Sequence, residues 1–124
     1  QIFRNVLDGT AHSVFQGGVM VRQDAQKTAS SQSNHNILLS AGAQADTKPE
    51  LQIFADDVKC AHGATVGDLD ETALFYLQSR GIPKRRAKAL LIEAFIAEIS
   101  DALSMGAVRD HVVDAVSAWM EDLG

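Results

Sequence analysis

Residues 49–67 read PELQIFADDVKCAHGATVG, and this stretch contains the only cysteine of the chain. Apolar and polar residues alternate from Leu51 to Ala55, the period of two that is typical of a half-buried β-strand. A turn is expected at Asp56–Asp57, and a second alternation follows it. Because alternate residues of a strand point to the same side, we expect Cys60 and His62 to share one face of one strand.

A thiol and an imidazole two residues apart are either two metal ligands or a nucleophile beside a base. A closed zinc site or an iron–sulfur cluster usually takes four protein ligands, so this pair would need ligands from another chain. A Cys–His nucleophile would need an orienting group and an oxyanion site, and the sequence offers a candidate for neither. The alternative stays open that Cys60 is a small buried hydrophobic residue and His62 a hydrogen-bonded turn residue.

The apolar runs on either side of this stretch, between Ile2 and Val66, are too short for helices. Turn residues separate them, which is typical of a sandwich, a barrel or a solenoid of short strands. Comparable apolar triplets begin at Val19, Ile37 and Leu51, with small polar residues between them, which favours stacked β-coils. The expected turns are Asp8-Gly9, Gly17-Gly18, Ser40 to Gly42, Asp46 to Pro49 and Asp56-Asp57.

The polar run Gln26–Asn36 could be a linker by composition, but it leads directly into an apolar triplet without Pro or Gly. We interpret it as a strand and a turn of one coil, with side chains that form hydrogen bonds along the stack. His12 and His35 lie among similar residues. We expect both to make ordinary polar contacts.

From Asp68 onward the spacing of apolar residues changes to that of helices. Asp68 with Glu71 three residues later resembles a capping box, and Gly81 is typical of the position after a helix C-terminus. Pro83 suits the first position of a second helix, and Gly106 separates a third segment. The apolar stripe of the second helix comprises Ala87, Leu90, Leu91, Ala94, Phe95, Ile99 and Leu103.

Five segments carry a resemblance to a known family: DTKP at 46–49, ADDVKC at 55–60, HGATVG at 62–67, LFYL at 74–77 and SRGI at 79–82. Together they resemble the SufB/SufD family of scaffold subunits in the SUF iron–sulfur cluster assembly machinery, and within it the C-terminal part of the SufD type. The resemblance runs from about His12 to about Leu103. It implies that the chain, which opens on Gln, is a fragment of a protein several times longer.

The same resemblance implies a fold and two partners. The expected fold is mainly β, with residues 1–67 forming the last coils of a right-handed parallel β-helix and residues 68–124 a small α-helical region. The expected protein is a non-catalytic scaffold that pairs with a SufB-type paralogue through the β-helix. Its C-terminal helices would bind a SufC-type ABC ATPase through Leu74, Tyr76, Leu77, Arg80, Leu91 and Phe95.

The resemblance also implies a role for the pair in residues 49–67. In the family, the histidine at the position of His62 is associated with the interface where a nascent cluster forms. His62, with Cys60 beside it, would hold an iron–sulfur cluster transiently in the assembled complex, and no cofactor would be bound stably. His62 and Gly63 are followed by Ala64 and not by Glu. This stretch is similar to that of the D-type subunit, whereas the B-type subunit has a Glu-containing version of it.

Four cations, Lys84, Arg85, Arg86 and Lys88, crowd the first turns of the second helix, where positive charge opposes the helix dipole. The related proteins tend to carry acidic residues there. The cluster is either a solvated face or a surface for an acidic patch on a partner.

Composition excludes several other functions. A net charge of -5, a pI near 5.2 and few aromatic residues argue against nucleic acid as a partner. Neither a Walker motif nor GxGxxG is present, and HExxH and GxSxG are also absent. No apolar run reaches the roughly 18 residues of a membrane span. A single cysteine fits a reducing compartment, so we expect a soluble, cytoplasmic protein.

Two alternative functions remain from the residues alone. A β-solenoid enzyme acting on polysaccharide would need facing carboxylates, which the adjacent Asp56 and Asp57 do not provide. It would also need an aromatic groove, whereas the phenylalanines fall in apolar patterns that indicate a core. A structural dimerisation module is the other alternative, in which the isolated chain forms a homodimer.

Overall fold

The computed structural model describes residues 1–101, 103 and 106–122. The chain divides into two compact units, Gln1–Asp68 and Leu69–Gly124. Every residue of the first unit is described. Residues 102, 104–105 and 123–124 of the expected helical region 68–124 lie outside the described residues.

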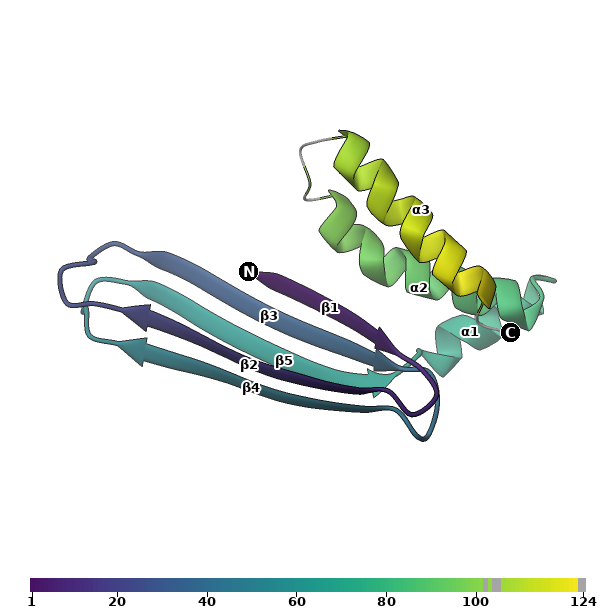
Figure 1. The fold of residues 1–124 in the computed structure, drawn as a ribbon, viewed down its shortest axis with the longest axis horizontal. Helices are drawn as coiled ribbons and strands as arrows, with labels where there is room; N and C mark the ends of the chain where they lie inside the picture. The colour runs from purple at the N-terminus through teal and green to yellow at the C-terminus, as the bar shows by residue number, and fades with distance from the viewer. Residues whose placement is uncertain (102, 104–105, 123–124) are drawn as a thin grey trace. The chain divides into compact units, whose positions relative to one another are not determined.

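The first unit consists of parallel strands in two sheets (Figure 1). One sheet has the order β1-β3-β5 and the other pairs β2 with β4. Successive strands therefore alternate between the sheets. Ile2 pairs with Ser33 and Ala29 with Lys59, so the chain returns to the same position after about thirty residues. The strands are β1 (Ile2–Leu7), β2 (His12–Val21), β3 (Ala29–Leu38), β4 (Gln44–Ile53) and β5 (Lys59–Asp68).

The space between the two sheets is filled by amide as well as apolar side chains. On β3, the alternate residues Gln32, Asn34 and Asn36 are buried, whereas the residues between them are more exposed. A Cβ added to Gly17 of β2 would lie 2.9 Å from Gln32 Nε2, so the Gln32 side chain reaches from one sheet toward the other. Val21, Ala43 and Ala55 form the buried apolar part of this unit.

Asn36 is the best-connected of these interior amides. Its Nδ2 donates to Asn34 Oδ1 at 2.7 Å and to the Thr65 carbonyl at 2.9 Å, and its Oδ1 accepts from Asn5 Nδ2 at 2.8 Å. Buried polar groups are tolerated when they are bonded in this way. The expectation that Gln26–Asn36 contains a strand and a turn is confirmed, because β3 begins at Ala29.

Of the five expected turns, two are wrong and three are confirmed, because turns also form at Asp8-Gly9 and at Ser40 to Gly42. Gly17-Gly18 lies inside β2 and Asp46 to Pro49 lies inside β4, whereas Asp56-Asp57 forms a bend before β5. Gly17 is needed for close packing, since a Cβ there would lie 2.6 Å from Phe15 Cζ.

Pro49 fits within β4 because its missing N–H faces away from β2. The Gln44 N–H donates to the carbonyl of Ala11, just before β2. The Phe54 N–H donates to the carbonyl of Val21, at the end of β2. The N–H groups of even-numbered β4 residues thus point toward β2, and the odd-numbered Pro49 faces the free edge, where proline is tolerated.

The second unit contains three helices among its described residues: α1 (Glu71–Ser79), α2 (Lys84–Asp101) and α3 (Gly106–Asp122). The N-cap of α1 is Asp70, whose carboxylate accepts from the backbone N–H of Thr72 at 2.8 Å and of Ala73 at 3.1 Å. The prediction of Asp68 as N-cap is therefore wrong. Asp68 stays in the sheet, paired with Leu38, and the helix begins only after the strand has ended.

The boundary between α1 and α2 follows the sequence. Gly81 has a φ of 85° and its N–H donates to the Gln78 carbonyl, as expected of a residue just after a helix. The Pro83 carbonyl accepts a hydrogen bond of 2.9 Å from the Ala87 N–H. This bond confirms that Pro83 stands at the start of the second helix. Ala87, Ile92 and Ser100 are the buried residues of α2, and Met120 is buried on α3.

The strands and the helices contain similar numbers of residues, so the chain is mixed rather than mainly β. The parallel sheets and the C-terminal helices agree with the expected order of elements. In the described part of the chain, the helices fall short of the length and apolar character that crossing a membrane requires.

Candidate functional site

Cys60 and His62 both lie on β5, at alternate positions, so the prediction that they share one face of a strand is confirmed. Cys60 is in register with Ser30 of β3, and His62 with Gln32. Partners in register on parallel strands point to the same side of a sheet. The thiol and the imidazole therefore belong to the face that carries Gln32 between the two sheets.

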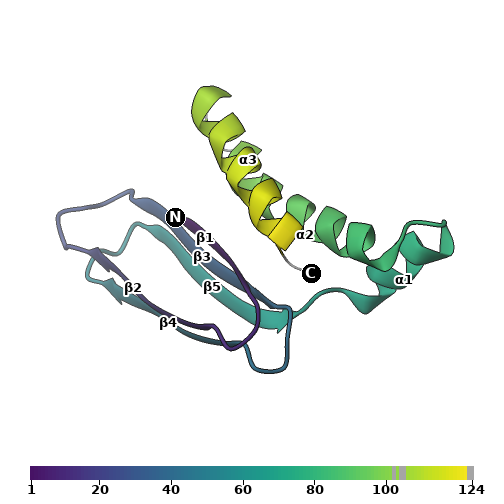
Figure 2. The ribbon, with the colours of Figure 1, turned by 45° about the vertical axis from the view of Figure 1, so that its right-hand side comes forward.

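This face is buried at β3 but open at β5. Gln32 is 2% exposed, whereas every residue from Ala61 to Asp68 is exposed and Cys60 is half-buried with a free thiol. The reason is topological: in residues 1–68 the β2-β4 sheet has no third strand opposite β5 (Figure 2). Within this unit, His62 is open to a partner.

The backbone of β5 also has a free edge at the same place. The Lys59 N–H donates to the Thr28 carbonyl of the β3 side, so odd-numbered β5 residues bond to β3. The N–H and carbonyl groups of Cys60 and His62 then point to the unpaired edge. Such an edge can accept a further strand from another polypeptide.

The pair does not make a closed metal site by itself. Among the described residues, no group of three or more His, Cys, Asp or Glu side chains is placed to hold a metal ion. If Cys60 and His62 bind iron, the remaining ligands have to come from outside these residues. Both side chains are chemically suited, because thiolate and imidazole are the usual nitrogen and sulfur ligands of iron.

The remaining histidines of the strand unit make polar contacts, as expected. His12 Nε2 lies 2.7 Å from Asp46 Oδ2, and His35 Nδ1 lies 2.8 Å from the hydroxyl of its register partner, Thr65. Both contacts are on the outer faces of the sheets.

The residues expected to bind an ATPase differ in exposure. Tyr76 is 55% exposed, and the Arg80 guanidinium carbon lies 5.0 Å from the centre of its ring. Leu74, Leu77, Leu91 and Phe95 are half-buried. Phe75, 73% exposed beside Tyr76, is a candidate contact that the sequence analysis missed.

Three phenylalanines correct the expectation of a core role, since Phe3 is 38% exposed in addition to Phe54 and Phe75. Phe54 is 62% exposed and Phe75 is 73% exposed, although both follow apolar neighbours in the sequence. Phe3 and Phe15 do pack together, with ring centroids 4.7 Å apart. An apolar neighbourhood in sequence therefore indicated burial correctly for only part of this set.

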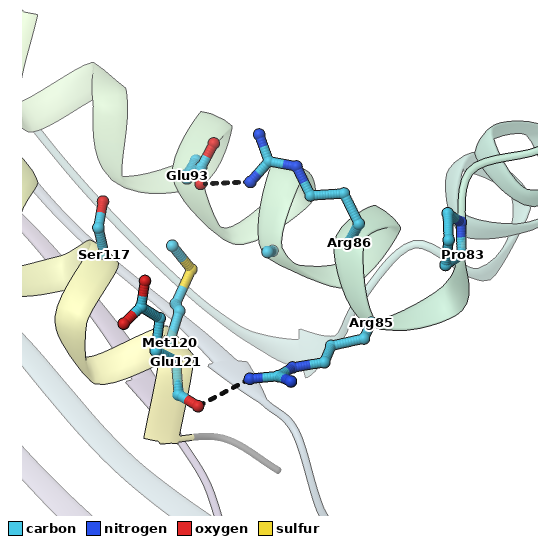
Figure 3. Close-up of a pocket in the computed structure, with 8 residues that line it drawn as sticks. Pro83, Arg85, Arg86, Glu93, Ser117, Met120 and Glu121 are labelled. Atoms are coloured by element: carbon cyan, nitrogen blue, oxygen red, sulfur yellow. Dashed lines mark hydrogen bonds and ion pairs between the residues drawn. The ribbon is translucent and has the colours of Figure 1, made fainter.

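The helical unit contains a hollow of about 400 Å³ between α2 and α3 (Figure 3). Arg85 Nη2 crosses to α3 and donates to the backbone carbonyl of Glu121 at 2.8 Å, and Arg86 Nη1 lies 3.3 Å from Glu93 Oε1. A cation at a helix C-terminus is favourable. Two of the four clustered cations thus already serve contacts within the helical unit.

Comparison with known proteins identifies a family. The model of the family described as "SUF system FeS cluster assembly, SufBD core domain" matches residues 1–95. The iron–sulfur cluster assembly protein SufD of Escherichia coli is 42% identical over 113 residues, 91% of this chain and 27% of that protein. A SufBD family protein of Synechocystis is 44% identical over 117 residues, 94% of this chain and 26% of that protein.

A plant relative matches at a similar level. The protein ABCI7, chloroplastic, of Arabidopsis thaliana is 42% identical over 115 residues, which is 93% of this chain and 24% of that protein. The chain therefore spans about a quarter of the length of the curated relatives it matches.

Proposed function

This chain belongs to the SufBD core family of the SUF system for iron–sulfur cluster assembly, and from that premise we propose that it acts as a non-catalytic scaffold subunit. Its residues 1–67 would be the last coils of a right-handed parallel β-helix. Two features support this fold: every strand pairing is parallel, and successive strands alternate between two sheets with a repeat of about thirty residues.

The scaffold would hold a nascent cluster at an interface with a SufB-type paralogue. One observation carries this proposal: Cys60 and His62 lie on the uncovered part of the inner face, next to the free edge of β5. A strand added to that edge would bring the partner's side chains beside the imidazole and the thiol. The cluster is the cargo of such a site, and His62 is its principal ligand in this chain.

A shared site explains how a cluster can be both built and released. Two ligands from one chain are too few for a stable cluster, so the cluster would be held only while both subunits are in place. A shift of the interface would remove part of the ligand set. We propose that the ATP cycle of a SufC-type ABC ATPase drives this shift, since the chain itself has no phosphate-binding motif.

The ATPase would bind the helical unit. The exposed Tyr76 and Arg80 are the strongest of the proposed contacts, with Leu74, Leu77, Leu91 and Phe95 as partly buried support. Aromatic and arginine side chains contribute most of the binding energy in many interfaces. The half-buried free thiol of Cys60 fits a reducing compartment, and we propose a cytoplasmic location.

The decisive experiment uses the full-length protein reconstituted with its SufB-type and SufC-type partners. Cluster formation is followed by visible absorption and by bound iron and sulfide, for wild type, His62→Ala and Cys60→Ser. We expect His62→Ala to lose most of the cluster while the complex keeps its size on gel filtration, and Cys60→Ser to lose less.

His12→Ala is the matched control, because His12 is also exposed on a strand of this unit but lies on an outer face. It should assemble clusters as wild type does. Normal assembly by His62→Ala would show that His62 is not a cluster ligand. A dimer of the isolated protein on the same column would indicate that the chain also associates with a second copy of itself.

A further inference from the structure

Gln32 and His62 occupy neighbouring positions on adjacent strands. They are register partners on β3 and β5, and both side chains belong to the inner face of the sheet. They differ sharply in exposure: Gln32 is 2% exposed, and His62 is exposed. The backbone position of a buried amide is thus next to that of the open imidazole.

The Gln32 amide has one unused hydrogen-bonding atom. Its Nε2 donates to Gln1 Oε1 at 2.9 Å, whereas its buried Oε1 has no hydrogen-bond partner among the described residues. A buried carbonyl oxygen without a partner destabilises a fold, so its retention calls for a reason. The free atom is an acceptor, and a neutral imidazole offers one N–H donor.

Other register pairs in this sheet show that such side chains reach each other. Asn5 and Asn36 are register partners joined by a hydrogen bond of 2.8 Å, and His35 and Thr65 are register partners joined at 2.8 Å. The His62 ring is exposed, and none of the hydrogen bonds described for residues 1–101 involves it. Because register partners on adjacent strands have neighbouring Cβ atoms, one ring nitrogen of His62 can be turned toward Gln32.

We propose that Gln32 Oε1 accepts a hydrogen bond from one ring N–H of His62 and leaves the other ring nitrogen directed to the open side as the iron ligand. The ligand part of this statement rests on the proposed function. Histidines that bind metals commonly donate their second N–H to a carbonyl or carboxylate oxygen, which fixes the tautomer and the ring orientation. Gln32 is then a positioning residue: it acts through His62 and does not itself contact the cluster.

The test observes the imidazole directly, in the full-length protein with ¹⁵N-labelled histidine rings. The His62 signals are assigned by their loss in His62→Ala. In wild type we expect one protonated and one unprotonated ring nitrogen, with the N–H slow to exchange with solvent. Gln32→Met keeps the side-chain length without the acceptor, and His62 should then shift to rapidly exchanging tautomers. Gln32→Glu restores an acceptor oxygen and should restore the single tautomer.

Asn34→Ala is the matched control, because Asn34 lies on the same face of β3 but is in register with Ala64. It disturbs the same interior and should leave the His62 signals unchanged. Equal His62 signals in wild type and Gln32→Met would overturn the proposal, as would equal shifts in Gln32→Met and Asn34→Ala. If Gln32→Met does not fold, the wild-type His62 signals decide alone. Two His62 tautomers in fast exchange would then overturn the proposal.

Cluster assembly in the reconstituted complex is the second measurement. Loss of a residue that orients a metal ligand typically costs about 10-fold to 100-fold in metal affinity or activity, and we expect a loss of at least about 10-fold for Gln32→Met. The two proposals can fail separately. If His62→Ala assembles clusters normally while Gln32→Met still changes the imidazole signals, Gln32 positions His62 but His62 is not a ligand.

Discussion

Asn36 of β3 accepts a 2.8 Å hydrogen bond from Asn5, its register partner on β1, in the interior between the two sheets. The same side chain donates to the Thr65 carbonyl on β5. One amide therefore connects all three strands of this sheet. The polar interior holds the strands in register, because an amide at this position has to be matched by partners at fixed positions on the neighbouring strands.

Removing this amide should destabilise the strand unit. Asn36→Ala leaves Asn5 Nδ2, Asn34 Oδ1 and the Thr65 carbonyl without their shared partner, at a cost of about 1–3 kcal/mol in the free energy of unfolding. Urea unfolding of the full-length protein, followed by circular dichroism, measures it. Ser31→Ala, an exposed position on the same strand, should stay within about 0.5 kcal/mol of wild type. Equal unfolding curves for Asn36→Ala and Ser31→Ala would contradict the prediction.

Two adjacent glycines of β2 should respond oppositely to alanine. A Cβ at Gly17 would lie 2.6 Å from Phe15 Cζ and 2.9 Å from Gln32 Nε2, whereas a Cβ at Gly18 meets nothing within 4 Å. We expect Gly17→Ala to lower the free energy of unfolding by about 1–3 kcal/mol through overpacking. Gly18→Ala should be neutral or slightly stabilising. Thermal unfolding of both variants checks this, and a loss of similar size at Gly18 would refute it.

The start of α1 should depend on Asp70 and not on Asp68. Asp70→Ala removes the acceptor for the Thr72 and Ala73 amides, which should cost about 1 kcal/mol and speed their hydrogen exchange. Asp68→Ala changes an exposed residue at the end of β5 and should leave these amides protected as in wild type. Exchange measured by mass spectrometry on peptides from α1 separates the two. The assignment fails if Asp68→Ala has the larger effect.

On the proposed function, Phe75 should contribute to ATPase binding. It is 73% exposed on α1, and burying a ring of this size in an interface is strongly favourable. Phe75→Ala should weaken binding of the SufC-type ATPase by at least about 10-fold, measured by titration calorimetry with the full-length protein. Gln78→Ala, an exposed polar position on the same helix, is the control. Unchanged affinity in Phe75→Ala would remove this residue from the interface.

Several elements could be predicted from local sequence because their cause is local. The bend at Asp56-Asp57, the glycine after α1 and the helix start at Pro83 all follow from the conformational preferences of single residues. The turns expected at Gly17-Gly18 and Asp46 to Pro49 failed for the opposite reason. There the neighbouring strand decided the conformation: β2 and β4 pair along their whole length, and local turn preference was overridden.

Sequence alone determined that Cys60 and His62 share a face, because the period of a strand is two and requires no knowledge of what lies opposite. Only the tertiary structure decided that this face is open at β5 and closed at β3, since burial depends on which strand of the other sheet stands across from it. It also placed Gln32 beside His62, thirty positions apart in the chain, through a register set by long-range pairing.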